Sequence, residues 1–135
     1  MEVFVGSSAF VSLRNPLDVN HEIAKSVAAQ LERAQTPLVT SNFIVAESLT
    51  VIAQRVSLAK AVEFREVFLP GVRVVRITEE IEEVAFDIFK RLTSKNVSFI
   101  DCTSFALMRE LGVKTAFAFD DHFKHHGFRL LGAGR

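Results

Sequence analysis

The sequence predicts an α/β domain with three layers, in which helices cover both faces of a short-stranded, mainly parallel central sheet. Short apolar stretches alternate with longer segments of helical apolar spacing. Parallel neighbours need crossover connections, and near-continuous apolar strands indicate a sheet that is covered on both faces. In such folds, ligands bind beyond the carboxyl ends of the strands. We therefore look for chemistry just after Val5, Thr40 and Phe119.

The expected elements follow from apolar periodicity, capping residues and turn signals. Pro70-Gly71 is a turn signal, Thr78 precedes an acid-rich helix start, and Gly112 suits the end of a helix. Strands are expected at residues 3–5, 38–40, 72–77, 115–119 and 128–131. Helices are expected at residues 9–13, 21–34, 42–55, 58–69, 79–92 and 99–111.

Length and hydropathy indicate one domain over residues 1–131, followed by a flexible C-terminal tail at residues 132–135. No apolar run approaches the ~20 residues that cross a bilayer. The N-terminus has no basic segment followed by a long apolar one, so it reads as a strand and not as a signal peptide. A cytoplasmic location is therefore expected.

Residue counts exclude several kinds of site. Cys102 is the only cysteine, which rules out an internal disulfide and a thiolate zinc site within one chain. Basic and acidic residues number sixteen each, so any nucleic-acid site must be local. There are thirteen Phe residues and no Tyr or Trp, and we expect the Phe side chains in the core.

Four acids lie at positions where a functional site is expected, although each also has a simpler structural explanation. Glu47 shares a helix face with apolar residues, and a carboxylate at the margin of that face could simply reach solvent. Asp101 follows Ser98 with capping-box spacing, so the helix dipole alone could favour it. Asp120 and Asp121 follow an apolar strand directly, where either could be an N-cap.

Together, Glu47, Asp101 and Asp120 indicate a metal site, because one end of the sheet could gather all three. Like charges at that density need a cation, and carboxylate oxygens suit Mg²⁺ or Mn²⁺. Such a site favours phosphodiester hydrolysis, in which the metal lowers the pKa of a water molecule and neutralises developing charge.

The chain resembles the PIN-domain family, in particular VapC-like toxin nucleases of toxin–antitoxin pairs. The resemblance extends from Val3 to Leu130 and depends on the order and spacing of short motifs. These motifs are a first strand entering Gly6-Ser7-Ser8-Ala9-Phe10, then Asp18-x-x-His21-x-x-Ala24, Ala46-Glu47, Ser98-Phe99-x-Asp101-Cys102, and Phe119-Asp120-Asp121-His122-Phe123 followed by Gly127-Phe128.

The resemblance implies a PIN-like α/β/α domain with Mg²⁺- or Mn²⁺-dependent endoribonuclease activity, frequent homodimers and an antitoxin partner. By position, Glu47, Asp101 and Asp120 match the second, third and fourth acids of the family. Asp121 is a candidate outer group, and Ser7 and Ser8 match the small hydroxyl residues that follow the first acid.

Gly6 stands where the family pattern has its first acid, so that carboxylate is missing. Either the chain is a degenerate natural member, or the substitution inactivates a toxin that would harm its host. The alternative function is a catalytically degenerate PIN domain that binds RNA or an antitoxin. A phosphoacceptor receiver domain ranks far below, since no acidic pair follows the first strand.

A basic patch follows the acidic segment and comprises Lys124, His125, His126 and Arg129. It could steer RNA phosphate, and a solvated surface turn explains it equally well.

Overall fold

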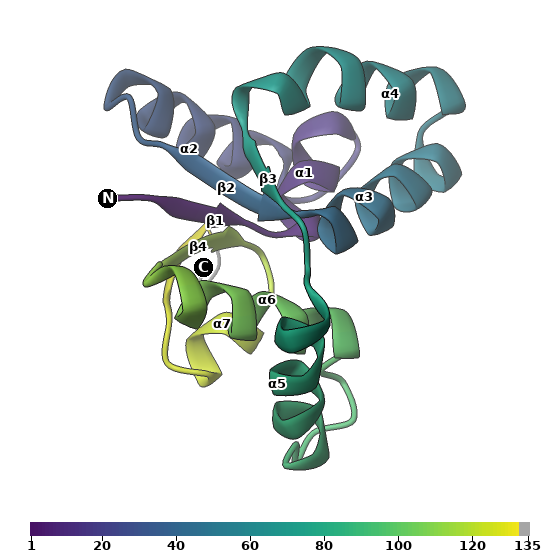
Figure 1. The fold of residues 1–135 in the computed structure, drawn as a ribbon. Coiled ribbons are helices and arrows are strands. Elements are labelled where there is room, and N and C mark those ends of the chain that lie inside the picture. The colour runs from purple at the N-terminus through teal and green to yellow at the C-terminus, as the bar shows by residue number, and fades with distance from the viewer. Residues whose placement is uncertain (133–135) are drawn as a thin grey trace.

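The computed structural model describes residues 1–132. Its centre is a five-stranded sheet in the order β3-β2-β1-β4-β5, and every neighbouring pair of strands is parallel. Figure 1 shows this sheet between two groups of helices. The strands are β1 (Val3–Val5), β2 (Leu38–Ser41), β3 (Arg73–Val75), β4 (Thr115–Ala118) and β5 (Arg129–Gly132).

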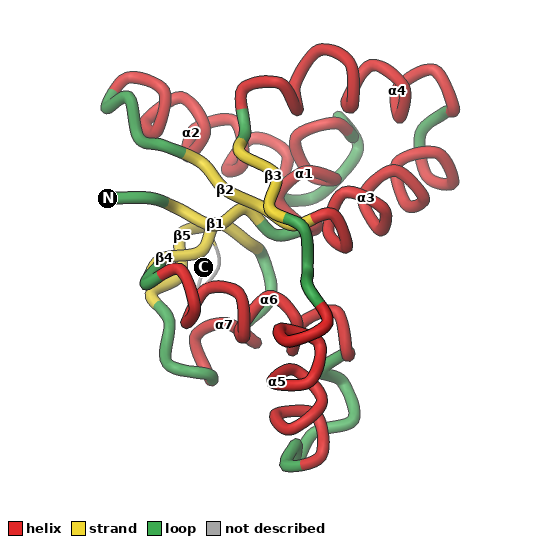
Figure 2. The backbone as a smooth tube through the Cα atoms, in the orientation of Figure 1, coloured by secondary structure: helices red, strands yellow, loops and turns green. Residues whose placement is uncertain are grey.

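Helices cover both faces of the sheet, as Figures 1 and 2 show, which confirms the predicted three-layer α/β/α class. One layer holds α1 (Ser7–Arg14), α2 (His21–Arg33) and α4 (Leu58–Glu63), and the other holds α5 (Glu79–Lys90), α6 (Phe99–Leu111) and α7 (His122–His125). Helix α3 (Asn42–Arg55) contacts both α1 and α6. None of the helices within residues 1–132 combines the length and the apolar character needed to cross a membrane.

The expected helix at residues 58–69 is the main departure from the predicted elements. Helix α4 ends at Glu63, and the chain continues as a π-helical segment, η1 (Phe64–Phe68), and a 3₁₀ turn, η2 (Leu69–Gly71). The widened turn coincides with the burial of Phe64, whose ring centroid lies 4.9 Å from that of Phe10. Packing of this one aromatic side chain therefore overrides the regular helical spacing.

The ends of the chain also differ slightly from the expectation. Strand β5 runs to Gly132, one residue past the predicted domain end, because Gly132 pairs with Ala118 of β4. The remaining residues of the predicted tail, 133–135, lie outside the described residues. Strand β3 is shorter than predicted and lies at the edge of the sheet.

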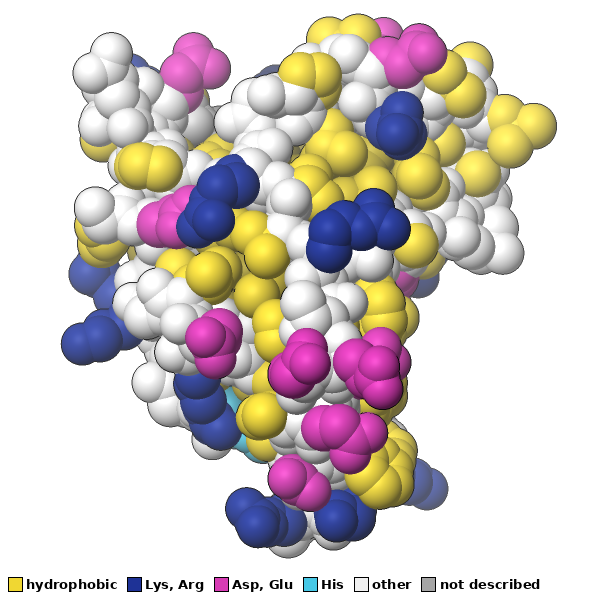
Figure 3. Space-filling view, in the orientation of Figure 1, with side chains coloured by type: hydrophobic (Ala, Val, Ile, Leu, Met, Phe, Trp, Pro, Cys, Tyr) yellow, Lys and Arg dark blue, Asp and Glu magenta, His cyan; other side chains and the backbone are white. Residues whose placement is uncertain are grey.

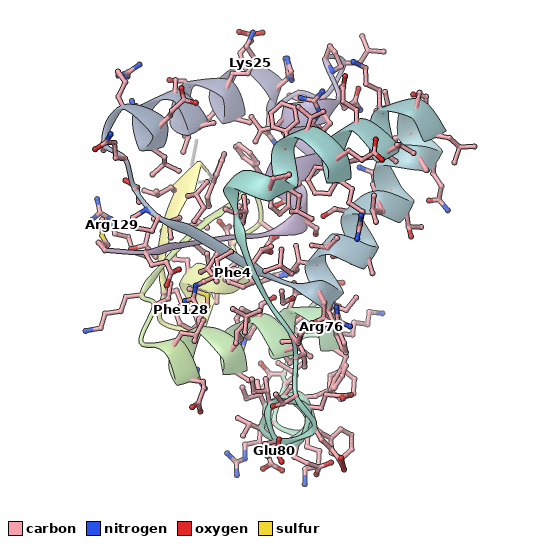
Figure 4. The ribbon with its side chains drawn as sticks, turned by 45° about the horizontal axis from the view of Figure 1, so that its top comes forward. Phe4, Lys25, Arg76, Glu80, Phe128 and Arg129 are labelled. Atoms are coloured by element: carbon pink, nitrogen blue, oxygen red, sulfur yellow. The ribbon has the colours of Figure 1, made fainter. Side chains whose placement is uncertain are left out.

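Phenylalanine dominates the core, as expected. Figure 4 shows Phe4 at the centre of the molecule, whereas Lys25 and Glu80 point outward at opposite ends. The fully buried rings are Phe4, Phe64, Phe105, Phe117 and Phe123. Phe123 joins the sheet to α6, because its ring centroid is 6.0 Å from that of Phe4 and 5.3 Å from that of Phe105. This packing fixes the segment after β4, where the candidate site lies.

Candidate functional site

The carboxyl ends of β1, β2 and β4 meet at one edge of the sheet and are tied together by hydrogen bonds. The backbone N–H of Gly6 donates to the carbonyl of Phe117 over 3.0 Å, and the Thr40 hydroxyl donates to the carbonyl of Val5 over 2.8 Å. The Ser8 hydroxyl oxygen accepts a hydrogen bond from the N–H of Phe119 over 2.9 Å. Ser8 therefore fixes the chain just before Asp120.

Asp101 makes the predicted capping box at the start of α6. Its Oδ2 accepts a hydrogen bond from the Ser98 N–H, and the Ser98 hydroxyl accepts one from the Asp101 N–H, both over 3.0 Å. The same Oδ2 lies 3.1 Å from Nδ1 of His122, on the segment that follows β4. Because a carboxylate can only accept, this contact requires a proton on Nδ1. Asp101 is thus both a helix cap and a member of the site.

Asp120 lies on the other side of the same imidazole. Its Oδ1 accepts a hydrogen bond from the backbone N–H of His122 over 3.1 Å and is 3.4 Å from His122 Nδ1. Burial, followed by repulsion from the Asp101 carboxylate, raises the pKa of Asp120, while His122 opposes this rise. His122 therefore bridges two carboxylates that repel each other. We call Asp101 and Asp120 the acidic pair.

Glu47 lies on the second turn of α3, which follows β2 at the same edge of the sheet, and its side chain is half-buried. Its carboxylate makes no hydrogen bond or ion pair with residues 1–132. Across these residues, no three His, Cys, Asp or Glu side chains already form a cluster suited to a metal ion. The structure brings Asp101 and Asp120 together around His122 and does not add Glu47 to that cluster.

The secondary candidates have different surroundings. Asp121 is exposed and occupies the N-cap position of α7 without a capping hydrogen bond from its side chain. Ser7 is half-buried in the first turn of α1, and Ser8 has the positioning contact with Phe119 described above. The Cys102 thiol is buried beside this site, and burial and then the Asp101 charge raise its pKa.

Gly6 is the N-cap of α1, and it provides no side chain to accept hydrogen bonds from the first turn. Its φ of −86° and ψ of 167° suit any L-residue. A Cβ at this position would lie 3.3 Å from the Ala118 Cβ and 3.5 Å from the Phe123 ring. A side chain at position 6 would therefore be packed against the end of β4, two residues before Asp120.

Sequence reasoning missed two parts of this site. His122 was noticed only as part of a motif, although its position two residues after Asp120 could have suggested contact with that carboxylate. The second is a cleft of about 400 Å³, which is lined by His122 together with Arg91 and Arg109. Of the predicted basic patch, His125 and His126 line this cleft, and Lys124 and Arg129 do not. His126 stacks on Phe105, and burial, then the nearby Arg109 charge, lowers its pKa.

Comparison with known proteins identifies the family. The family model of the PIN domain matches residues 3–129. The chain belongs to the PIN-domain family. This PIN domain is also 36% identical over 128 residues to the 23S rRNA-specific endonuclease VapC20 of Mycobacterium tuberculosis, covering 93% of this chain and 95% of the relative. The predicted VapC-like resemblance is confirmed.

Solved structures agree with the fold of this PIN domain. The crystal structure of Mycobacterium tuberculosis VapC20, described as a sarcin-ricin loop cleaving toxin, superposes with a TM-score of 0.83 at 35% identity, covering 93% of this chain and 95% of that one. VapBC2 from Rickettsia felis, bound to a promoter DNA fragment, gives a TM-score of 0.74 at 12% identity, with both chains fully covered. FitAcB from Neisseria gonorrhoeae gives 0.72 at 15% identity, covering 97% and 96%. The last two comparisons bear on the fold alone.

Proposed function

We propose that this PIN domain is a metal-dependent endoribonuclease of the VapC toxin type, which hydrolyses phosphodiester bonds in RNA. The observation that carries the proposal is the acidic pair around His122, at the strand ends where α/β folds bind ligands. The 36% identical relative named as a 23S rRNA-specific endonuclease supports RNA, and ribosomal RNA in particular, as the substrate.

The residues of the site fit a hard divalent cation, for which we propose Mg²⁺ or Mn²⁺. Asp101 and Asp120 offer carboxylate oxygens, the ligands that these ions prefer. Burial and then repulsion from Asp101 raise the pKa of Asp120, and a cation would relieve that repulsion. Asp101 and Asp120 would hold the ion, with Glu47 as a further ligand from α3. When bound, such an ion lowers the pKa of water and offsets charge at the phosphorus centre.

The protein's own contribution is to hold the carboxylates in place. The Ser98 N–H and the His122 ring fix the Asp101 carboxylate, and the His122 backbone N–H fixes that of Asp120. The Ser8 hydroxyl anchors Phe119, immediately before Asp120. The site is therefore pre-organised by hydrogen bonds from three separate segments, which lowers the cost of ordering it on binding.

The second candidate function is a binding module that holds RNA or an antitoxin without cleaving RNA. Two observations favour it: Gly6 contributes no carboxylate, and no cluster of three ligands is already formed within residues 1–132. The acidic pair would then serve at most as a weak metal site beside the bound partner.

We also propose an antitoxin protein as a partner, a homodimer as the assembly, and the cytoplasm as the location. An apolar groove of about 450 Å³ between α1, α2 and η1 offers room for an antitoxin segment. Phe86 and Phe89 on α5 are 47% and 42% exposed, and their stacked rings suit contact with a second copy.

The test is cleavage of a ribosomal RNA stem-loop with Mg²⁺ or Mn²⁺, with and without a chelator. Variants Asp101→Asn and Glu47→Gln should lose activity, whereas Asp87→Asn, an exposed acid on α5, should not. Chelator-insensitive cleavage would refute the metal mechanism. RNA binding without cleavage at any metal concentration would establish the binding module in its place.

A further inference from the structure

A basic cleft lies between the end of α5, α6 and α7, next to the acidic pair. Its volume is about 400 Å³. Helix α5 and the loop after it contribute Arg91, helix α6 contributes Arg109, and the α7 segment contributes three histidines. The remaining walls are Ile88, Leu92, Thr93, Ser94 and Val97. Among residues 1–132, no carboxylate lines the cleft.

The two arginines of the basic cleft are not engaged by acidic side chains of the described part of the chain. Neither Arg91 nor Arg109 forms an ion pair among residues 1–132, and both side chains are exposed. Helix α5 carries acids in its first half, and Figure 3 shows acidic side chains over this helix, but none of them lines the cleft. Asp87, near the end of α5, pairs with Lys90 over 3.3 Å and not with Arg91. The charge of the cleft is therefore available to a ligand.

Arg109 is also held in place at the wall of the cleft. Its Nη2 donates to the carbonyl of His126 over 3.5 Å, and its guanidinium carbon lies 5.8 Å from the centre of the Phe128 ring. The His126 ring stacks on Phe105 with a centroid distance of 4.3 Å. Stacking and hydrogen bonding reduce the conformational freedom that binding would otherwise remove. Two cleft side chains are thus oriented before any ligand arrives.

His122 connects the basic cleft to the acidic pair. It lines the cleft, and its Nδ1 is 3.1 Å from Asp101 and 3.4 Å from Asp120. A group bound in the cleft is consequently separated from the acidic pair by one imidazole ring. A polymer that enters the acidic site can place its neighbouring backbone unit in the cleft.

We infer that the basic cleft is a phosphate subsite that binds the RNA backbone next to the scissile phosphodiester. The inference rests on the proposed ribonuclease function. Guanidinium groups suit phosphate because their donors match its oxygens in a planar fork. The hydroxyls of Thr93 and Ser94 add neutral donors that suit the same oxygens. The subsite explains how a chain with equal numbers of acidic and basic residues concentrates positive charge where RNA must lie.

The experiment measures binding of a ribosomal RNA stem-loop to the full chain by fluorescence anisotropy in chelator, so that no cleavage occurs. Arg91→Gln combined with Arg109→Gln should weaken binding about tenfold or more and reduce the slope of log K against log salt by about 1 to 2. The matched control is Arg33→Gln, because Arg33 is also an exposed arginine in the last turn of a helix, on the opposite layer. It should bind RNA like the parent chain. Compared with the double Gln variant, Arg91→Lys with Arg109→Lys should recover part of the RNA affinity, because lysine restores the positive charge but not the planar pair of guanidinium donors.

Several further outcomes decide the inference. Equal affinity of the double Gln variant and Arg33→Gln would overturn it. If inorganic phosphate binds the cleft but the double Gln variant keeps the RNA affinity of the parent chain, the cleft binds free phosphate and not RNA. If the double Gln substitution weakens binding of an acidic peptide but not of RNA, the cleft binds a protein. Either result refutes the RNA subsite. In a cleavage assay with metal, the double Gln variant should raise KM and leave kcat nearly unchanged. If the double Gln variant cleaves RNA with the KM of the parent chain, the subsite is refuted and the proposed ribonuclease function is not. If the parent chain binds RNA through the cleft but does not cleave it, only the proposed ribonuclease function is refuted.

Discussion

Replacing Gly6 by Asp should increase the affinity of the site for divalent metal and the rate of RNA cleavage. The backbone at Gly6 already has a conformation that Asp adopts, and the new side chain would start 3.3 Å from the Ala118 Cβ, beside the strand that leads to Asp120. The substitution therefore adds a carboxylate close to the acidic pair and supplies an N-cap that α1 lacks.

The expected effect on folding without metal is small. Loss of glycine freedom stabilises by about 0.4–1 kcal/mol, and the cap adds a few tenths. Against this stand the tight Cβ contact and repulsion from Asp120, whose pKa is already raised. The effect on the free energy of metal binding is larger. Two unit charges 4 Å apart interact by about 1 kcal/mol in water and about 4 kcal/mol at a protein surface, and the double charge of the cation doubles this attraction. After desolvation we expect a net gain of about 1–3 kcal/mol, or about 5- to 150-fold in Kd.

The assay compares the parent chain with Gly6→Asp and Gly6→Asn. Asn has nearly the same size and capping ability without the charge, so it isolates the carboxylate. Mn²⁺ affinity is measured by calorimetry, and cleavage of the RNA stem-loop is measured with and without chelator. Adding Asp101→Asn to Gly6→Asp should reverse the gain. If Gly6→Asn binds metal as tightly as Gly6→Asp, or if the parent chain already cleaves as fast, the argument from the missing carboxylate is wrong.

Three further predictions concern stability and assembly. The pKa of Asp120 is raised in the folded state, so between the ordinary carboxyl pKa and the raised one the folded state binds more protons than the unfolded state. The free energy of unfolding should therefore fall as pH rises through this range. Asp120→Asn should flatten this part of the pH profile in chelator-treated urea titrations, and an unchanged profile would contradict the assignment. Ser8→Ala should destabilise the fold by about 1 kcal/mol, because the part-buried N–H of Phe119 loses its acceptor, and thermal unfolding in chelator measures this. Phe86→Ser combined with Phe89→Ser should weaken self-association at least about tenfold in sedimentation experiments, because both rings are partly exposed; a parent chain that is monomeric at micromolar concentration would refute the dimer.

The fold was largely predictable because it depends on local signals. Strand β1, helix α2 and the left-handed Gly112 at the end of α6 follow from apolar spacing and capping, and all are present. The π-helical segment at Phe64 was not predictable, because it depends on packing against Phe10 from another helix. Tertiary packing of this kind leaves no trace in the local pattern.

The candidate site was only partly predictable for the same reason. Asp101 has the expected capping box, and the sequence also suggested a role in the site, but only the structure shows one carboxylate oxygen making both contacts. The position of His122 between Asp101 and Asp120 depends on the path of the chain after β4, which Phe123 and Ser8 determine. The role of Glu47 as a third ligand stays a prediction.

The most direct test of the account is where a divalent ion binds. The chain has four histidines, and paramagnetic Mn²⁺ broadens the NMR signals of nearby imidazoles. His122 touches the acidic pair, whereas His21 lies on α2 and bonds to the carbonyl of Ser12 in the other layer. We predict that substoichiometric Mn²⁺ broadens the His122 ring signals first and leaves those of His21 sharp, and that Asp101→Asn with Asp120→Asn abolishes this selectivity. Equal broadening of both histidines, or selective broadening that persists in the double variant, would contradict a metal site at the acidic pair.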